Sequence, residues 1–273
     1  MNDLILPSGF IDENEERLSQ NFIKNGFVIV DIENQRLLQY LRNAIADFIR
    51  EYFSLESSVD TELLLNETSS FLKEDDLNKF RLNILNKINN EKWFRPTYFK
   101  LVEKYLSLLV GNELVMQKKV NLSIQLPQDS SSLLDLHADT WSGDSPFEIV
   151  CWLPLVNCYK TKSMYILPPD ESEKFHESFS SYSDLSSEDV FSKIKNKVVW
   201  IDIPFGSALL FNQSLPHGNR VNNEKNSRWS MNCRFKSVFS PYVKKQIGDF
   251  FEPISLKAVS RMGISYKLPI LDK

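Results

Sequence analysis

The chain has only three histidines, and two of them lie in segments that are far apart in the sequence. These two segments must meet in the fold if both histidines bind the same metal ion. His137 precedes Asp139 in the segment Leu136–Trp141, and His217 lies far downstream in Leu215–Asn219. In an extended strand, residues i and i+2 point to the same side, so His137 and Asp139 can bind one metal ion together. With His217 as the third ligand, the fold must bring the two segments together.

Two imidazoles and one carboxylate on one face of an octahedral ion leave three positions open, a geometry typical of non-haem iron(II) oxygenases. Structural zinc closes its coordination shell and usually recruits cysteine, so it fits less well. The alternative is a buried histidine that is merely hydrogen-bonded to a carboxylate. The segments on either side of His217 favour the metal site, because they read as buried or cavity-lining strands.

The segment after His217 alternates strictly between polar and apolar residues. Upstream, the segment from Phe205 to Phe211 reads as a turn followed by a buried strand. Downstream, Arg228, Ser230, Asn232 and Arg234 share one face of a strand, and the residues between them are apolar. A polar strand face normally meets water, but inside a small barrel it can line a cavity. There, Arg228 could pair with a carboxylate through two hydrogen bonds.

From about Val120 to Tyr242 the chain resembles the core of the Fe(II)/2-oxoglutarate-dependent dioxygenases, in the phytanoyl-CoA dioxygenase-like branch. It also resembles the oxygenases of bacterial sporadic carbohydrate-biosynthesis clusters. The matching segments are His137-Ala138-Asp139, Glu148–Leu155, Ser163–Pro168, Gly206–Asn219 and Arg228-Trp229-Ser230. Two local departures are Ser207, where the family usually has aspartate, and the turn at Pro168–Ser172.

The resemblance implies a double-stranded β-helix, which is a jelly-roll or cupin-like barrel. It implies that His137, Asp139 and His217 hold Fe(II) and that Arg228 and Ser230 hold the distal carboxylate of 2-oxoglutarate. The family oxidises small molecules with O2 while converting 2-oxoglutarate to succinate and CO2. Asp139 favours hydroxylation or desaturation, because related halogenases carry a small residue there. The expected substrate is a sugar or nucleotide-sugar, with a lipid, amino acid or other metabolite as alternatives.

Hydrophobic spacing predicts an α+β chain with one oxygenase domain over residues 1–273. Helices predicted at 13–25, 35–53 and 94–110, with a strand at 27–31, make residues 1–112 a mainly helical buttress. Residues 113–242 form the barrel core, with a helical insertion at 170–197. Residues 243–273 form a closing segment, with Val259 and Met262 expected on a docked helix.

Period-two alternation from Val120 to Leu126 predicts a strand. Asn121 and Gln125 share its polar face, and we expect one of them, Gln125 first, to contact 2-oxoglutarate; a water-facing polar face is the alternative. Arg234 shares a face with Arg228 and competes for the same carboxylate. His176 is expected to be a surface or packing residue.

Composition narrows the function further. A net charge of −4 gives no electrostatic case for nucleic acid or an anionic membrane. Cys151, Cys158 and Cys233 form no disulfide pattern. With no secretory signal or membrane span at Met1–Pro7 or elsewhere, a cytoplasmic enzyme is expected. P-loop, dinucleotide and nucleophile-elbow motifs are absent. Two alternatives remain: a barrel that only binds ligands, and a cupin-type metal enzyme that does not use 2-oxoglutarate. No feature indicates an oligomeric state.

Overall fold

The computed structural model describes residues 9–270, so the predicted absence of a signal at Met1–Pro7 lies outside the described residues. The helices are α1 (Glu13–Asn25), α2 (Gln35–Phe53), α3 (Thr61–Asn66), α4 (Glu74–Asn90), α5 (Phe94–Leu109), α6 (Pro169–Glu177), α7 (Ser187–Ile194) and α8 (Ala258–Ile264). Short 3-10 turns are η1 (Thr68–Ser70), η2 (Asp139–Ser142), η3 (Lys160–Lys162) and η4 (Phe179–Tyr182). The strands are β1 (Phe27–Asp31), β2 (Leu114–Gln117), β3 (Asn121–Gln125), β4 (Ile149–Pro154), β5 (Tyr165–Ile166), β6 (Val199–Trp200), β7 (Ser207–Asn212), β8 (His217–Gly218), β9 (Arg228–Ser237) and β10 (Phe251–Pro253).

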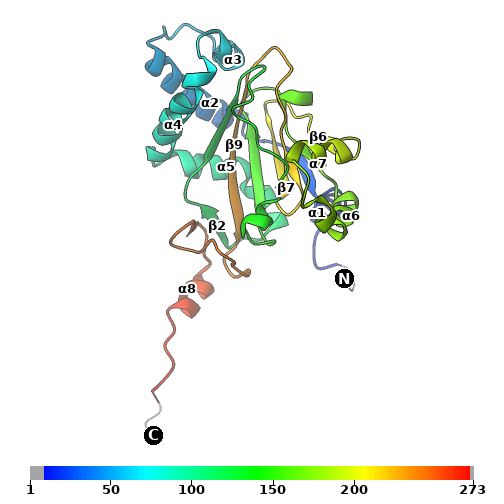
Figure 1. The fold of residues 1–273 in the computed structure, drawn as a ribbon. Helices are drawn as coiled ribbons and strands as arrows, with labels where there is room; N and C mark the ends of the chain where they lie inside the picture. Colours follow the sequence, from blue (N-terminus) through cyan, green and yellow to red (C-terminus); the bar gives the residue numbers. More distant parts are fainter. Residues whose placement is uncertain (1–8, 271–273) are drawn as a thin grey trace.

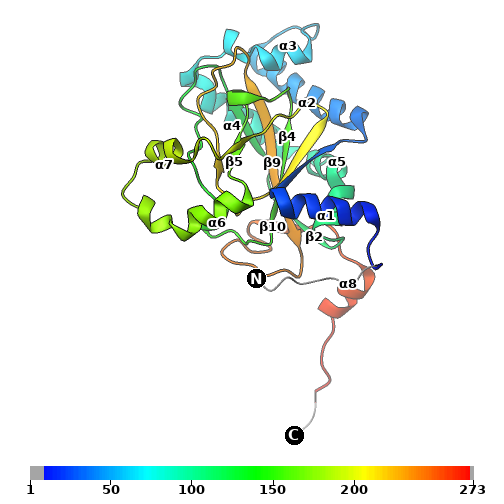
Figure 2. The same cartoon turned by 90° about the vertical axis from the view of Figure 1, so that its right-hand side faces the viewer.

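The strands form two antiparallel sheets. The larger follows the order β1-β7-β4-β9-β2-β10, with β3 also pairing with β9, and the smaller follows β6-β5-β8. In Figure 1 the helices α2, α3 and α4 lie on one side of the large sheet, and α6 and α7 lie on the other. Figure 2 shows α6 and α7 together to the left of the strands of the large sheet. The predicted α+β class is confirmed.

The predicted N-terminal elements are confirmed at their boundaries. Asp12 caps α1 by accepting hydrogen bonds from the backbone of Asn14 and Glu15. Gly26 ends the helix at φ 74°, in the left-handed region that glycine tolerates best. Strand β1 then pairs with β7, and α2 buries Leu41 and Ile45 in the core.

Strand β9 carries the predicted alternation, and both of its faces are covered. Trp229, Met231, Cys233 and Phe235 are fully buried on the helical side. There the Trp229 ring meets the edge of Phe80 from α4 at 5.8 Å between centroids, and its Nε1 donates to Thr68 Oγ1 at 2.8 Å. The polar face of β9 therefore points away from the helices, toward the interior between the two sheets.

Two sequence predictions are wrong in detail. His137 and Asp139 do not lie on a regular strand, because His137 forms only an isolated bridge to His217 and Asp139 begins η2. The closing segment docks only in part. Phe251 is buried, whereas Val259 and Met262 on α8 are 79% and 73% exposed, since α8 extends away from the body (Figures 1 and 2). The insertion at 170–197 is helical as predicted.

Within residues 9–270, no helix combines the length and the apolar character that crossing a bilayer requires.

Candidate metal centre

His137 and His217 meet through a two-way backbone pair. The His137 N–H donates to the His217 carbonyl at 3.0 Å, and the His217 N–H donates back at 2.8 Å. Since β8 also pairs with β5, His217 is held between β5 and the His137 segment. The two imidazole rings lie 4.4 Å apart between centroids. The distant segments are thus joined at the point that the ligand spacing requires.

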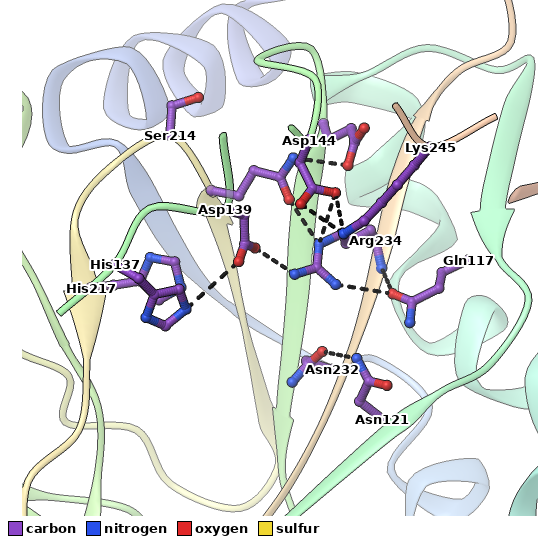
Figure 3. Close-up of polar contacts among 12 residues, drawn as sticks. Gln117, Asn121, His137, Asp139, Asp144, Ser214, His217, Asn232, Arg234 and Lys245 are labelled. Carbon is purple, nitrogen blue, oxygen red and sulfur yellow. Dashed lines mark hydrogen bonds and ion pairs between the residues drawn. The ribbon is translucent and has the colours of Figure 1, made fainter. Parts of the chain in front are cut away.

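Asp139 reaches the same point although it is not in a strand. Ala138 is extended and fully buried, so His137 and Asp139 still project to one side. The Asp139 N–H donates to the Gln213 carbonyl at 3.0 Å, which fixes the start of η2. Its Oδ1 lies 3.6 Å from His137 Nε2 (Figure 3). One ligand atom from each of the three side chains lies within 4.8 Å of the others.

Hydrogen bonds orient both imidazoles for metal binding. His137 Nδ1 contacts the Asp135 carbonyl at 2.7 Å, and His217 Nδ1 contacts the Leu215 carbonyl at 2.8 Å. Because a carbonyl only accepts, each Nδ1 carries the proton and each Nε2 keeps its lone pair for a metal. Burial, followed by the nearby His137, lowers the pKa of His217 to about 4. His217 is therefore neutral at physiological pH.

Asp139 is ionised beside the two imidazoles. Its burial would raise its pKa, but Arg234, His217 and His137 together bring the pKa below its ordinary value. Among the described residues this triad is the one group of three such side chains placed to hold a metal ion. Two neutral nitrogen donors and one carboxylate, with no cysteine, match the ligand preference of Fe(II) better than that of structural zinc.

The triad opens into a cavity of about 230 Å³ between the two sheets. Its wall is formed by β3, β4, β7, β8 and β9, with Trp152 and Phe211 among the apolar residues. The polar face of β9 contributes Arg228, Asn232 and Arg234, as the alternation predicted. The cavity therefore combines the candidate metal ligands with two cationic side chains.

Arg228 is a buried cation without an acidic partner. It is 3% exposed; its Nη1 donates to the Ser163 carbonyl at 3.2 Å and its Nη2 donates to Ser123 Oγ at 3.0 Å. Its Nε has no hydrogen-bond partner, and none of the ion pairs among residues 9–270 includes Arg228. Burial lowers its pKa to about 10, so it stays charged at neutral pH. A buried unpaired cation is costly unless an anion joins it.

Other polar atoms near Arg228 are also buried without partners: Ser230 Oγ, Ser163 Oγ and Gln125 Oε1. Gln125 lies directly opposite Arg228 in the β3–β9 register, but its Nε2 donates to the Arg220 carbonyl at 2.7 Å. Neither Ser230 nor Gln125 is among the residues that line the cavity. Such orphaned groups are rare in native interiors. The Ser163 and Ser230 hydroxyls can donate to an anion beside Arg228, whereas Gln125 Oε1 can only accept a hydrogen bond.

Arg234 plays a different part from Arg228. Its Nη2 donates to Asp139 Oδ2 at 2.6 Å (Figure 3). Its Nε donates to Gln213 Oε1 at 2.9 Å. The sequence identified Arg234 only as a rival for the cosubstrate, because both arginines share one strand face. The contact with Asp139 was not predicted, since it depends on where η2 begins.

A second, wider groove of about 800 Å³ lies alongside the cavity, between α4, β3 and residues 131–134. The two share Asn121, Ser123, Leu134 and Asn232. At this junction Asn121 Nδ2 donates to Asn232 Oδ1 at 3.0 Å. The groove therefore adjoins the cavity that holds the metal ligands. His176 lies elsewhere, packed against the Trp141 ring at 5.9 Å.

Comparison with protein-family profiles gives no matching family, and no curated protein matches the chain in sequence. Solved structures do match. EctD from S. alaskensis with 2-oxoglutarate and 5-hydroxyectoine has a TM-score of 0.57 at 14% identity, covering 94% of this chain and 89% of EctD. The non-heme monooxygenase ThoJ in complex with nickel has a TM-score of 0.52 at 13% identity, covering 88% and 89%. HygX from Streptomyces hygroscopicus with nickel and 2-oxoglutarate has a TM-score of 0.50 at 11% identity, covering 84% and 88%. Over most of its length, the chain thus shares its fold with a non-heme monooxygenase and with two proteins that were solved with 2-oxoglutarate bound.

Proposed function

We propose that this chain is a non-haem Fe(II)- and 2-oxoglutarate-dependent oxygenase that hydroxylates a small molecule. The observation that carries the proposal is one cavity holding both a two-histidine, one-carboxylate triad and a buried arginine without an acidic partner. The first provides a metal site with open positions, and the second provides a site for an anionic cosubstrate.

His137, Asp139 and His217 would hold the iron, with both imidazoles presenting Nε2. When bound, iron and 2-oxoglutarate supply the oxidising power from O2, and 2-oxoglutarate leaves as succinate and CO2. The chain positions these groups and shields them: Trp152 and Phe211 give the cavity an apolar wall that limits water.

Arg228 would bind the distal carboxylate of 2-oxoglutarate, with Ser230 as a second donor. Ser123 and the Ser163 carbonyl already hold the guanidinium, so the cation is oriented before the ligand arrives. Gln125 would support this subsite from the paired strand, through its bond to the Arg220 carbonyl. Arg234 is engaged with Asp139, which favours Arg228 as the cosubstrate residue.

The two facing sheets, with the cavity between them, support a double-stranded β-helix within a single domain. We assign the chain to the phytanoyl-CoA dioxygenase-like branch on its sequence motifs, and we place it in the cytoplasm because its three cysteines are free and buried.

For the substrate we propose a sugar or nucleotide-sugar that enters through the groove. Asparagine and serine side chains line that path, and hydroxyl-rich molecules pair well with them. Arg81 is the one cation among the described residues that line the groove, and it already donates to Asn78 Oδ1 at 2.8 Å. Glu74 and Asp75 lie at the same groove, so the sugar is favoured over its phosphate-bearing form.

Succinate formation from 2-oxoglutarate, with and without Fe(II), tests the proposal. Wild-type protein should turn over slowly even without substrate, and His217→Ala should abolish turnover. Arg228→Ala should raise the 2-oxoglutarate concentration needed by roughly 10- to 100-fold, because a hydrogen bond to a charged group contributes about 1.5–3 kcal/mol. The control Arg17→Ala changes an exposed side chain on α1. Succinate formation that is unaffected by Arg228→Ala would contradict the role of Arg228, and Fe(II) binding without any succinate formation would indicate a metal protein that does not use 2-oxoglutarate.

A further inference from the structure

The two oxygens of Asp139 face different partners. Oδ1 points to the imidazoles, 3.6 Å from His137 Nε2, whereas Oδ2 accepts the 2.6 Å hydrogen bond from Arg234 Nη2. Both side chains of this ion pair are largely buried, at 11% and 14% exposure, so solvent screens it little. Oδ1 therefore faces the candidate metal position, while Oδ2 is held by Arg234.

The Arg234 guanidinium is itself held in place. Its Nε donates to Gln213 Oε1 at 2.9 Å, and its Nη1 contacts Gln117 Oε1 at 3.4 Å. Gln213 is fully buried, and its own Nε2 donates to Glu148 Oε2 at 2.8 Å. The Gln213 carbonyl also accepts the Asp139 N–H. One glutamine thus positions both partners of the ion pair.

A second carboxylate, Asp144, lies near Arg234, but it forms an ion pair with Lys245. Asp144 Oδ1 is 3.9 Å from Arg234 Nε, and Lys245 Nζ lies 2.6 Å from the same oxygen (Figure 3). Lys245 therefore balances the charge of Asp144. Arg234 therefore pairs with Asp139. Its planar guanidinium matches the geometry of a carboxylate better than the ammonium group of a lysine would.

We propose that Arg234 is a positioning residue that restricts Asp139 to one metal-facing oxygen. The inference rests on the proposed function and goes beyond it. In an octahedral shell, a carboxylate that binds through both oxygens would occupy one position more. With two histidines, only two positions would then remain, whereas 2-oxoglutarate and O2 together need three. By holding Oδ2, Arg234 keeps the third position open.

The test measures Fe(II) affinity by anaerobic titration, then the affinity of the loaded protein for 2-oxoglutarate from the visible charge-transfer band. Arg234→Met removes the donors and should weaken Fe(II) binding by roughly 10- to 100-fold, as for other residues that orient metal ligands. At saturating Fe(II), 2-oxoglutarate should also bind about 10-fold more weakly, because the freed Oδ2 competes for its position. Arg234→Lys restores one donor and should recover part of both losses.

The matched control is Arg95→Met. Arg95 forms an ion pair of the same 2.6 Å length, with Glu252, outside the cavity, so both affinities should stay at wild-type values. If Arg234→Met fails to fold by circular dichroism, Gln213→Met loosens Arg234 indirectly and should shift both affinities in the same direction.

The outcomes separate the two proposals. If the wild-type protein does not form a complex with both Fe(II) and 2-oxoglutarate, the proposed function is overturned. Wild-type protein that forms the complex, with an Arg234→Met variant that binds iron and 2-oxoglutarate equally well, would overturn only the positioning role. A weaker affinity that Arg234→Lys does not recover at all would also contradict it, because a merely structural defect is indifferent to the restored donor.

Discussion

Gly218, immediately after the second histidine, shows how closely the backbone packs around the candidate metal centre. A Cβ atom at Gly218 would lie 2.7 Å from the Leu134 carbonyl oxygen and 2.8 Å from the Tyr165 hydroxyl. The first of these is backbone of the segment leading to His137, so it cannot move without shifting a ligand. The requirement for glycine at this position is steric, since its φ is not in the left-handed region.

Gly218→Ala should therefore destabilise the fold by about 1–3 kcal/mol, the usual cost of overpacking. It should also weaken metal binding, because His217 must move with the strand. Denaturant unfolding and Fe(II) titration measure the two effects. Gly263→Ala is the matched control: a Cβ there meets nothing within 4 Å. Equal stability of the two variants would show that the segments around His217 are not tightly packed.

At the scale of elements, strand β9 was the most predictable and the metal-binding segment the least. The alternation in β9 placed Trp229 in the core and Arg228 toward the cavity, because a strand's period of two fixes which side each residue faces. The same rule brought His137 and Asp139 to one side. It could not predict that Asp139 begins η2, because that turn depends on the Gln213 carbonyl, which is distant in sequence.

The Arg234–Asp139 ion pair was missed for the same reason. Local patterns show the face of a strand but not the partner that a distant turn presents to it. Likewise, the spacing of apolar residues predicted a docked C-terminal helix, but α8 buries none of its side chains. The spacing shows that a helix has an apolar face, not whether the fold offers a surface for that face to pack against. Boundaries set by local caps, such as Asp12 and Gly26 on α1, were predictable.

Gly26 also connects an element boundary to the site. A Cβ atom at Gly26 would lie 2.1 Å from Leu215 Cδ1, and the Leu215 carbonyl orients His217. Gly26→Ala should cost about 2–4 kcal/mol, combining the left-handed conformation with the clash. Gly248→Ala shares a positive φ, at 90°, but has open space, so it should cost only about 1 kcal/mol. Thermal unfolding of both variants checks the difference; equal losses would contradict the steric contribution.

For the whole molecule, helices α2, α4 and α5 pack on one side of the large sheet and leave the other side for the cavity (Figure 1). This division explains why the core and the candidate site share β9 without competing for the same side chains. Helix α8 lies apart from this arrangement, because none of its side chains is buried.

A chain that ends after Lys257 should therefore keep its unfolding midpoint and its Fe(II) affinity. Val259 and Leu268, at 79% and 80% exposure, bury little surface against the body. Phe251→Ala, in contrast, removes a fully buried ring from β10 and should cost about 3–5 kcal/mol. Differential scanning calorimetry compares the two variants. A large loss on truncation would mean that α8 contributes to the folded body.

The most direct test of the central claim is an anaerobic titration of Fe(II) and then 2-oxoglutarate into the metal-free protein, followed by visible absorption. We expect a weak charge-transfer band at one iron and one 2-oxoglutarate per chain. The band should be absent in His217→Ala and should need a higher 2-oxoglutarate concentration in Arg228→Ala. Iron binding without a band on adding 2-oxoglutarate would contradict the cosubstrate assignment, and no iron binding at all would contradict the triad.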